Sequence, residues 1–357
     1  MRSILFVELL GGMGDILIAL PAIHALARSH TNASITVLTF APGAELLQHD
    51  PWVQRVVVAE AGAARRSLDQ LLATESFDLI VSDTNYDGMA ERIQSTTAQT
   101  VTNMWRSPPA DALVSDRFLS ILLSEGVITQ ERAQQRLAQL HPTATETATA
   151  REVLGAAYRP LIFLCPDAGM AIKRWSVQHF TRLGQVLQQR YRATILVPVG
   201  ANQAEAEALS QSIGGTAQVW RRGSLRSLAA VLAEADLVIA ADTGLARIAA
   251  AVNTPTITLF GPSWHGRYGQ PAPHVNLQGV PDCPERVIGN FTEQRCWYSG
   301  DCPFAWATCV DMVTPEQVMQ AAAGLLKHPQ PNAASLIPQP GQESQSKFPS
   351  KSPTLGI

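Results

Sequence analysis

The apolar positions of this chain fall into short continuous runs that alternate with stretches of helical spacing. Residues Ser3 to Leu9 form an apolar run typical of a strand, a glycine loop follows, and Ile16 to Arg28 carry apolar residues at the spacing of a helix. This order of strand, loop and helix predicts a parallel sheet that is covered by helices on both faces. The further elements expected in this part are strands at Ser34–Thr39, Gln54–Val58 and Phe77–Ser82, and helices at Leu68–Thr74 and Asp111–Glu125.

A second series of the same kind begins near residue 160. The segment from Thr129 to Ala157 is rich in Gln, Ala and Thr and lacks strand signals, so we expect the domain junction there. The sequence therefore predicts two domains, residues 1–150 and 151–328, each a doubly wound α/β unit. The expected elements of the second unit are strands at Pro160–Cys165, Thr194–Val199, Ala217–Trp220, Leu237–Ala241 and Thr256–Phe260, with a first helix at Val177–Arg190.

The end of the chain differs from the rest in composition. Residues 329–357 are rich in Pro, Gln, Ser and Lys and contain almost no large apolar side chains. Such a segment cannot bury enough apolar surface to offset the entropy of ordering it. We expect it to be a disordered tail.

Length and charge limit the classes of function. A chain of 357 residues suits two domains that each bury a core of their own. A net charge of −3, without a basic stripe interleaved with aromatic residues, gives no reason to expect a nucleic-acid partner. Glycines interrupt the apolar N-terminus, and no run approaches the roughly 20 apolar residues of a spanning helix. We expect a soluble cytoplasmic protein, for which peripheral contact with the inner membrane stays open.

Lysine is almost missing from the chain. Four of the 27 Lys and Arg residues are lysines, and Lys173 is the only lysine among the first 326 residues. Because the chain otherwise uses arginine, Lys173 suggests a site that needs a compact point charge, such as a phosphate site or a reacting oxygen. The alternative is an accident of composition at an exposed helix start.

The loop from Gly11 to Asp15 lies where the first expected strand ends and the first helix begins. Glycines at Gly12 and Gly14 allow a sharp turn and a close approach of the backbone to a ligand. Their spacing is not the dinucleotide fingerprint, which argues against a dehydrogenase or an epimerase that uses a dinucleotide. Asp15 is either a helix cap or a general base at the carboxyl edge of the sheet.

Loops of the second unit end strands at the equivalent edge. Asp242, Thr243 and Gly244 follow an expected strand and open a helix, where free backbone amides form an anion site and the Thr243 hydroxyl adds a donor. Asp242 could accept hydrogen bonds from sugar hydroxyls, or could be a capping residue only. Gly261 lies in the loop that ends the next strand, and Lys173 lies in the loop after the first.

Taken in order, these motifs resemble glycosyltransferase family 9, the ADP-heptose:lipopolysaccharide heptosyltransferase family, over nearly the whole folded length. The resemblance implies a GT-B fold, in which two Rossmann-like domains face each other across a cleft and the C-terminal domain holds the nucleotide sugar. The motifs that carry it are the glycine loop up to Asp15 with Ala19–Ala22, Lys173–Trp175, Asp242–Gly244, and Thr254–Pro262.

The resemblance also implies the chemistry. It implies an inverting, metal-independent transfer that needs no cofactor, from a nucleotide-diphosphate sugar such as ADP-heptose to a lipopolysaccharide-type or other glycan or lipid-linked acceptor. Asp15 would deprotonate the acceptor hydroxyl, and Lys173 would stabilise the leaving diphosphate. Asp242 would hold the donor sugar. The remaining expected donor-site residues are Gly12, Gly14, Thr243, Gly244, Arg247 and Gly261.

Two positions depart from the family pattern. Arg247 stands where members usually carry a histidine, and Asp167 stands where a small glycine is common, beside the expected diphosphate site. These departures predict a divergent member, and they leave a non-catalytic nucleotide-sugar-binding relative as the alternative. Retention of both Asp15 and Lys173 favours the enzyme, because binding alone needs no base in the opposite domain.

Four of the five cysteines lie within 27 residues of one another. Their spacing contains no Cys-x-x-Cys pair, so it indicates a zinc site only weakly, and reduced, packed thiols are the alternative. Disulfides are not expected in a cytoplasmic chain. These four are Cys283, Cys296, Cys302 and Cys309, whereas Cys165 falls in an expected core strand.

Overall fold

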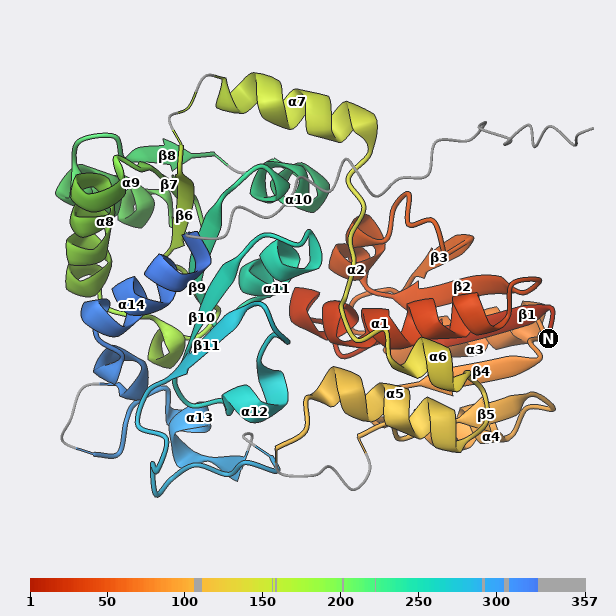
Figure 1. Cartoon of the computed structure of the whole chain (residues 1–357). Helices are drawn as coiled ribbons and strands as arrows, with labels where there is room; N and C mark the ends of the chain where they lie inside the picture. Colours follow the sequence, from red (N-terminus) through yellow and green to blue (C-terminus); the bar gives the residue numbers. More distant parts are fainter. Residues whose placement is uncertain are drawn as a thin grey trace, which may run out of the picture.

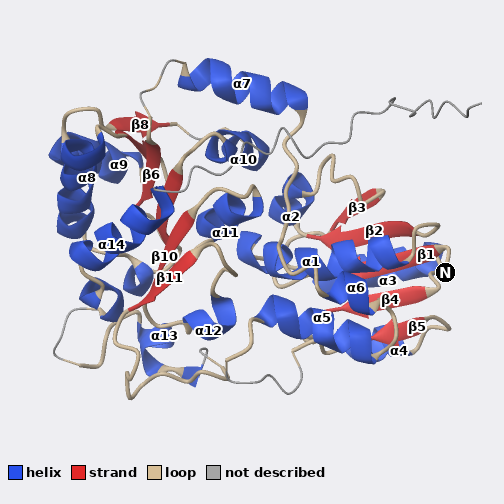
Figure 2. Cartoon of the chain, in the orientation of Figure 1, coloured by secondary structure: helices blue, strands red, loops and turns tan. Residues whose placement is uncertain are grey.

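Two parallel sheets, each covered by helices, form the computed structural model of this chain (Figure 1). In Figure 2 the strands of the two sheets lie well apart, and helices occupy the space between them. The expected tail at residues 329–357 lies outside the part that the structure describes. The described residues are 1–105, 111–155, 157, 159–200, 202–221, 223–290, 293–304 and 308–326.

The N-terminal sheet has five parallel strands in the order β3-β2-β1-β4-β5. Its central strand β1 (Ser3–Val7) is buried along most of its length, which explains its continuous apolar run. The other strands are β2 (Ser34–Thr39), β3 (Arg55–Val58), β4 (Leu79–Ser82) and β5 (Gln99–Val101). The helices are α1 (Met13–Ser29), α2 (Ala41–Leu46), α3 (Ala64–Thr74), α4 (Met89–Gln94), α5 (Val114–Ser124) and α6 (Gln130–Ala133).

The C-terminal sheet has six parallel strands in the order β11-β10-β9-β6-β7-β8. They are β6 (Leu161–Cys165), β7 (Thr194–Pro198), β8 (Gln218–Trp220), β9 (Leu237–Ala241), β10 (Thr256–Phe260) and β11 (Val275–Gln278). The helices in this half are α7 (Ala144–Leu154), η1 (Ala171–Lys173, a 3₁₀ turn), α8 (Val177–Tyr191), α9 (Gln203–Ile213), α10 (Leu225–Ala233), α11 (Gly244–Ala251), α12 (His265–Tyr268), α13 (Arg295–Ser299), η3 (Cys309–Met312, a 3₁₀ turn) and α14 (Pro315–Leu326).

The predicted α/β architecture is confirmed, and each expected strand is present to within about two residues. The prediction missed two edge strands, β5 and β11, which are short and partly exposed. The boundary expected at residues 150/151 stays a prediction. It falls inside α7, a helix that packs against α10 of the C-terminal half.

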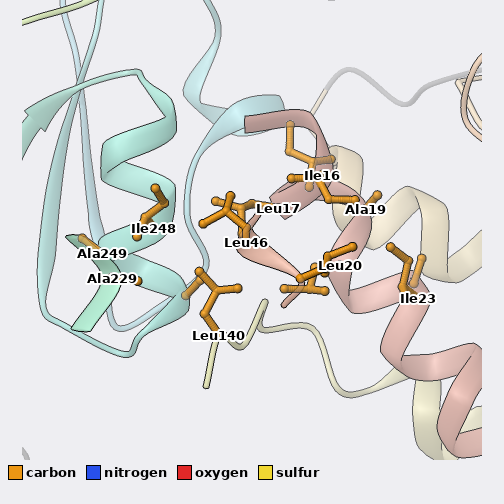
Figure 3. Close-up of a cluster of buried hydrophobic side chains, with 14 of the residues drawn as sticks. Ile16, Leu17, Ala19, Leu20, Ile23, Leu46, Leu140, Ala229, Ile248 and Ala249 are labelled. Carbon is orange, nitrogen blue, oxygen red and sulfur yellow. The ribbon is translucent and has the colours of Figure 1, made fainter. Parts of the chain in front are cut away.

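One apolar cluster runs through both halves of the molecule (Figure 3). Leu17 and Leu20 of α1 belong to the same buried cluster as Ile248 and Ala249 of α11, and helices α1 and α11 are in contact. Burial of apolar surface therefore stabilises the junction of the two sheets as well as each separate layer.

Arg226 of α10 joins three segments that are far apart in the sequence. Its buried guanidinium donates to both carboxylate oxygens of Glu146 on α7, at 2.6 and 2.7 Å. It also donates to the carbonyl of Leu46 at the end of α2, at 3.1 Å, and to the carbonyl of His141, at 2.9 Å. The hydrogen bonds from Arg226 lower the pKa of Glu146 to about 2. The guanidinium of Arg226 thus links α10 to the end of α2 in the N-terminal half and to the segment that contains His141 and Glu146.

Replacing Arg226 should therefore destabilise the fold. We predict that Arg226→Ala lowers the free energy of unfolding by about 2–4 kcal/mol, because it leaves a carboxylate and two carbonyls without their donor. The measurement is equilibrium denaturation in urea. Arg151→Ala is the matched control, because Arg151 pairs with Glu234 on the surface, where loss of an ion pair costs under about 1 kcal/mol. Equal losses for the two variants would contradict the prediction.

Candidate active site

Two helix N-termini meet where the halves of the molecule join. Helix α1 follows β1 and helix α11 follows β9, and their first turns are in close contact. A Cβ atom on Gly244 would lie 2.8 Å from the Cβ of Met13, and one on Gly14 would lie 3.4 Å from the Arg247 side chain. At Gly244 only a glycine permits this approach without movement of the backbone. Both helices direct free amides and the positive ends of their dipoles toward the same region.

A cavity of about 830 Å³ opens beside this contact and is bordered by both halves of the molecule. The structure brings eight of the residues singled out in the sequence into its wall, namely Gly12, Gly14, Asp15, Lys173, Asp242, Thr243, Gly244 and Arg247. Gly261 is not in the wall, and its carbonyl accepts hydrogen bonds from Gln278 and Arg286. The glycine loop and the second-unit motifs therefore belong to one site.

Asp242 is the centre of a charged network in the wall of this cavity. Its Oδ2 accepts hydrogen bonds from Lys173 Nζ at 2.9 Å and from Ser263 Oγ at 2.6 Å. Its Oδ1 lies 3.7 Å from a guanidinium nitrogen of Arg247. Burial alone would raise the pKa of Asp242, but the charges of Lys173 and Arg247 outweigh it and lower this pKa below its ordinary value. Asp242 is therefore ionised at neutral pH.

Asp242 and Trp297 fix the position of the Lys173 ammonium group. Lys173 ends η1, and its ammonium also contacts the Asp242 backbone carbonyl at 3.4 Å. The Trp297 ring lies with its centre 4.9 Å from Lys173 Nζ, a distance at which a cation and an aromatic ring attract each other. The side chain of Lys173 is still 16% exposed. Its charge thus has a fixed position and borders the cavity.

Asp15 lines the same cavity from the other half of the molecule. Its Oδ2 accepts a hydrogen bond of 3.0 Å from the Gly12 amide, so the expected role as a helix cap is real. Burial raises the pKa of Asp15 above its ordinary value, although the charges of Arg247 and Lys173 act in the opposite direction. A carboxylate with increased proton affinity at the edge of a cavity suits a general base. The cap and the base are therefore compatible roles for this residue.

Arg247 is a further cation in the wall of the cavity. It is buried in the first turn of α11, and its guanidinium donates to the Tyr268 carbonyl at 2.5 Å. Its charge acts on both Asp15 and Asp242. This arginine therefore helps to keep two nearby acids ionised in a site that is mostly shielded from water.

The sequence did not single out several residues of the site. Ser263 donates to Asp242, Trp297 covers Lys173, and Arg267 lines the cavity from α12. Trp297 and Arg267 lie in very short helices that carry no motif, whereas Ser263 lies in the loop after β10, next to the Thr254–Pro262 motif. Only Ser263 had a usable signal, because it lies three residues after the end of β10, at the edge where the other site residues lie.

Asp167 has a counterion within its own half of the molecule. Its carboxylate pairs with Arg174 at 2.9 Å, and Arg174 also pairs with Glu205 at 3.3 Å. Asp167 does not line the cavity. Arg174 thus offsets part of the extra negative charge expected beside the diphosphate site.

The four clustered cysteines gather around a void of only about 10 Å³, together with Arg286. All are free thiols. Burial raises the pKa of Cys309 to about 12 and also raises that of Cys296, so both are protonated at neutral pH. In the described ranges no group of three or more His, Cys, Asp or Glu residues is arranged to hold a metal ion. The weak indication of zinc from the spacing and its alternative, reduced packed thiols, both stay predictions.

Across the described ranges, no helix combines the length and the apolar character that crossing a bilayer requires.

Comparison with known proteins relates the chain to one family. The family model described as glycosyltransferase family 9 (heptosyltransferase) matches residues 112–286. Lipopolysaccharide heptosyltransferase 2 of Escherichia coli is 25% identical over 225 residues, which cover 60% of this chain and 62% of that protein, so the match falls short of two thirds of its length. Lipopolysaccharide heptosyltransferase 1 of Pseudomonas aeruginosa is 28% identical over 291 residues, covering 74% of this chain and 81% of that protein.

The fold agrees with this relationship. The structure of E. coli ADP-heptose lps heptosyltransferase II superposes with a TM-score of 0.68 at 17% identity, over 92% of this chain and 99% of that one. At this identity the likeness shows the fold alone. The two-domain GT-B architecture, with a cavity between two doubly wound halves, is thereby confirmed.

Proposed function

Because this chain is a divergent, heptosyltransferase-like member of glycosyltransferase family 9, we propose that it transfers a heptose or a related sugar from a nucleotide-diphosphate donor. The proposed donor is ADP-heptose or a close relative, and the proposed acceptor is a lipopolysaccharide-type or other lipid-linked glycan. The observation that carries this proposal is the meeting of Asp15 with the Lys173–Asp242 pair in one cavity between two domains.

The proposed donor site uses the C-terminal wall of the cavity. The first amides of α11 form an anion site, and the Thr243 hydroxyl beside them is buried and has no hydrogen-bond partner among the described residues. A phosphate oxygen would satisfy that hydroxyl. Lys173 lies on the same wall and supplies the cation. These groups support binding of the diphosphate at the start of α11.

In the proposed reaction Asp15 takes the proton from an acceptor hydroxyl. The acceptor oxygen then forms a bond to the anomeric carbon of the donor, while the bond from that carbon to the diphosphate oxygen breaks. The electron pair of the broken bond leaves with the nucleoside diphosphate, where Lys173 and the α11 amides stabilise the added negative charge. A single displacement of this kind inverts the anomeric configuration, and the step as proposed involves no metal ion or cofactor.

Asp242 has two tasks in this proposal. Its carboxylate holds Lys173 in position and offers lone pairs to hydroxyls of the donor sugar. Arg247, in place of the family histidine, adds a second cation near the same carboxylate and can alter which sugar is accepted. We also propose that the protein works in the cytoplasm and meets its lipid-linked acceptor at the cytoplasmic face of the inner membrane.

The role of Asp15 is tested by Asp15→Asn. An asparagine oxygen can still accept the Gly12 hydrogen bond, so the cap is kept while the base is lost. We predict a decrease in kcat of about 10²–10⁴-fold with little change in the Kd for ADP-heptose, measured by release of ADP with a lipopolysaccharide-core acceptor and by calorimetry. Glu91→Gln, at an exposed carboxylate of the same domain, is the control and should retain full activity.

These measurements distinguish a sugar transferase from a protein that only binds the nucleotide sugar. Full turnover by Asp15→Asn would refute the base. A wild-type protein that binds the nucleotide sugar but transfers it to no acceptor would favour the non-catalytic relative.

The role of Lys173 is tested by Lys173→Arg, which keeps the charge but changes its shape. A planar guanidinium does not fit the compact position between Asp242 and Trp297. We predict a loss of kcat of about 10²-fold or more, with less than about a tenfold loss of donor affinity. The control Arg174→Lys alters a neighbouring cation that does not line the cavity, and it should remain active. Equal turnover by Lys173→Arg and wild type would refute a specific role for Lys173.

A further inference from the structure

Two buried carboxyl groups lie side by side beneath the glycine loop. Glu8 directly follows β1 and Asp83 directly follows β4, and these strands pair in parallel up to Val7 and Ser82. Glu8 and Asp83 therefore occupy adjacent positions on neighbouring strands. Each is only 1% exposed, and neither takes part in an ion pair in the described part of the chain.

Their hydrogen bonds leave one oxygen without a partner. Glu8 accepts from Thr39 Oγ1 at 2.8 Å and from the Leu10 amide at 3.0 Å, so both of its oxygens are used. Asp83 Oδ1 accepts from Thr84 Oγ1 at 3.0 Å. Asp83 Oδ2 is buried without a hydrogen-bond partner among the residues described. A bare carboxylate oxygen in such a place is costly, whereas a protonated one could donate a hydrogen bond.

The electrostatic surroundings of Glu8 and Asp83 favour a state in which the two carboxyl groups together hold one proton. Burial raises the pKa of Glu8 to about 7 and raises that of Asp83 well above its ordinary value, and the charge of Glu8 adds to the effect on Asp83. Two adjacent buried carboxyls without a counterion do not both ionise at neutral pH.

The pair is connected to the loop that carries Asp15. Glu8 accepts from the Leu10 amide, and the Thr84 hydroxyl, which donates to Asp83, accepts from the Leu9 amide at 2.8 Å. The charge of Asp15 acts on both carboxyls, and by reciprocity the charge of the pair acts on Asp15. Three titratable groups of the N-terminal half surround this assembly, namely Asp15 on α1 and Tyr86 and Asp87 after β4. The charged groups that face Asp15 from the other half are Arg247, Lys173 and Asp242.

We propose that Glu8 and Asp83 share one proton beneath the glycine loop and act as positioning residues for Asp15. This inference rests on the proposed function, because Asp15 needs positioning only if it is the base. The pair holds the loop through Leu9 and Leu10, and its single negative charge strengthens the hold of Asp15 on the acceptor proton. Neither carboxyl lines the cavity, so neither touches the substrate.

The shared proton makes a specific prediction for the pH dependence of kcat/KM. Because Glu8 has a pKa of about 7, the single negative charge of the pair is present above that pH and is lost as the pH falls through it. Asp83→Asn mimics the protonated partner and keeps this charge, so its kcat/KM should rise near pH 7 as in the wild type. The double variant E8Q/D83N has no such charge and a lower pKa of Asp15 above pH 7, so it should lack this rise. The control E60Q/E91Q neutralises two exposed acids of the same domain and should keep the wild-type profile.

Two results would overturn the proposal. One is a profile of Asp83→Asn that already differs from that of the wild type, since both carboxyls would then be ionised in the wild type. The other is a folded E8Q/D83N variant with the wild-type profile, since the pair would then have only a packing role.

Infrared spectroscopy tests the proton without any assay of transfer. At neutral pH the wild type should show a carbonyl band of a protonated carboxylic acid that Asp83→Asn lacks and E60Q/E91Q retains. Identical bands in wild type and Asp83→Asn would refute the shared proton. If the wild type transfers no sugar, both the proposed function and the positioning role are refuted. The infrared band still shows whether the pair holds a proton.

Discussion

The contact between the first turns of α1 and α11 determines how the rest of the site is arranged. Gly14 and Gly244 allow the two helices to meet closely, and the apolar cluster around Leu17 and Ile248 holds them together. Arg226 also stabilises the junction of the two halves, through hydrogen bonds to Glu146 on α7 and to the carbonyl of Leu46 on α2. Because of this contact, Asp15 of one domain and Asp242 of the other line a single cavity.

The site is built from opposite charges held in fixed positions and mostly shielded from water. Lys173 and Arg247 keep Asp242 ionised, and they reduce the effect of burial on Asp15. In this setting a compact ammonium on a flexible stem serves better than a fork of five donors, which gives a physical reason for the only lysine among the first 326 residues. In the proposed reaction the same charge meets the leaving diphosphate.

The sequence predicted what depends on local pattern and missed what depends on distant contacts. Strands β1 and β9 and the glycine-containing turns after them are marked by apolar runs and loop residues, so Asp15 and Asp242 could be found. The pairing of Lys173 with Asp242 follows from the adjacency of β6 and β9, which no local pattern contains. The neighbours Glu8 and Asp83 are 75 positions apart, and neither alone differs from an ordinary acid at a strand end. Short, partly exposed strands such as β11 contain no continuous apolar run, so the sequence pattern did not predict them.

In the proposed reaction the sugar is transferred by a single displacement, Asp15 is the only base, and the diphosphate leaves on the side of Lys173. The most direct test is the anomeric configuration of the product, determined by NMR from the one-bond carbon–hydrogen coupling at the anomeric carbon after transfer from a donor of known configuration. A single displacement should give complete inversion. Retention would require a second displacement through a covalent or ion-pair intermediate, and it would contradict the roles given to Asp15 and Lys173.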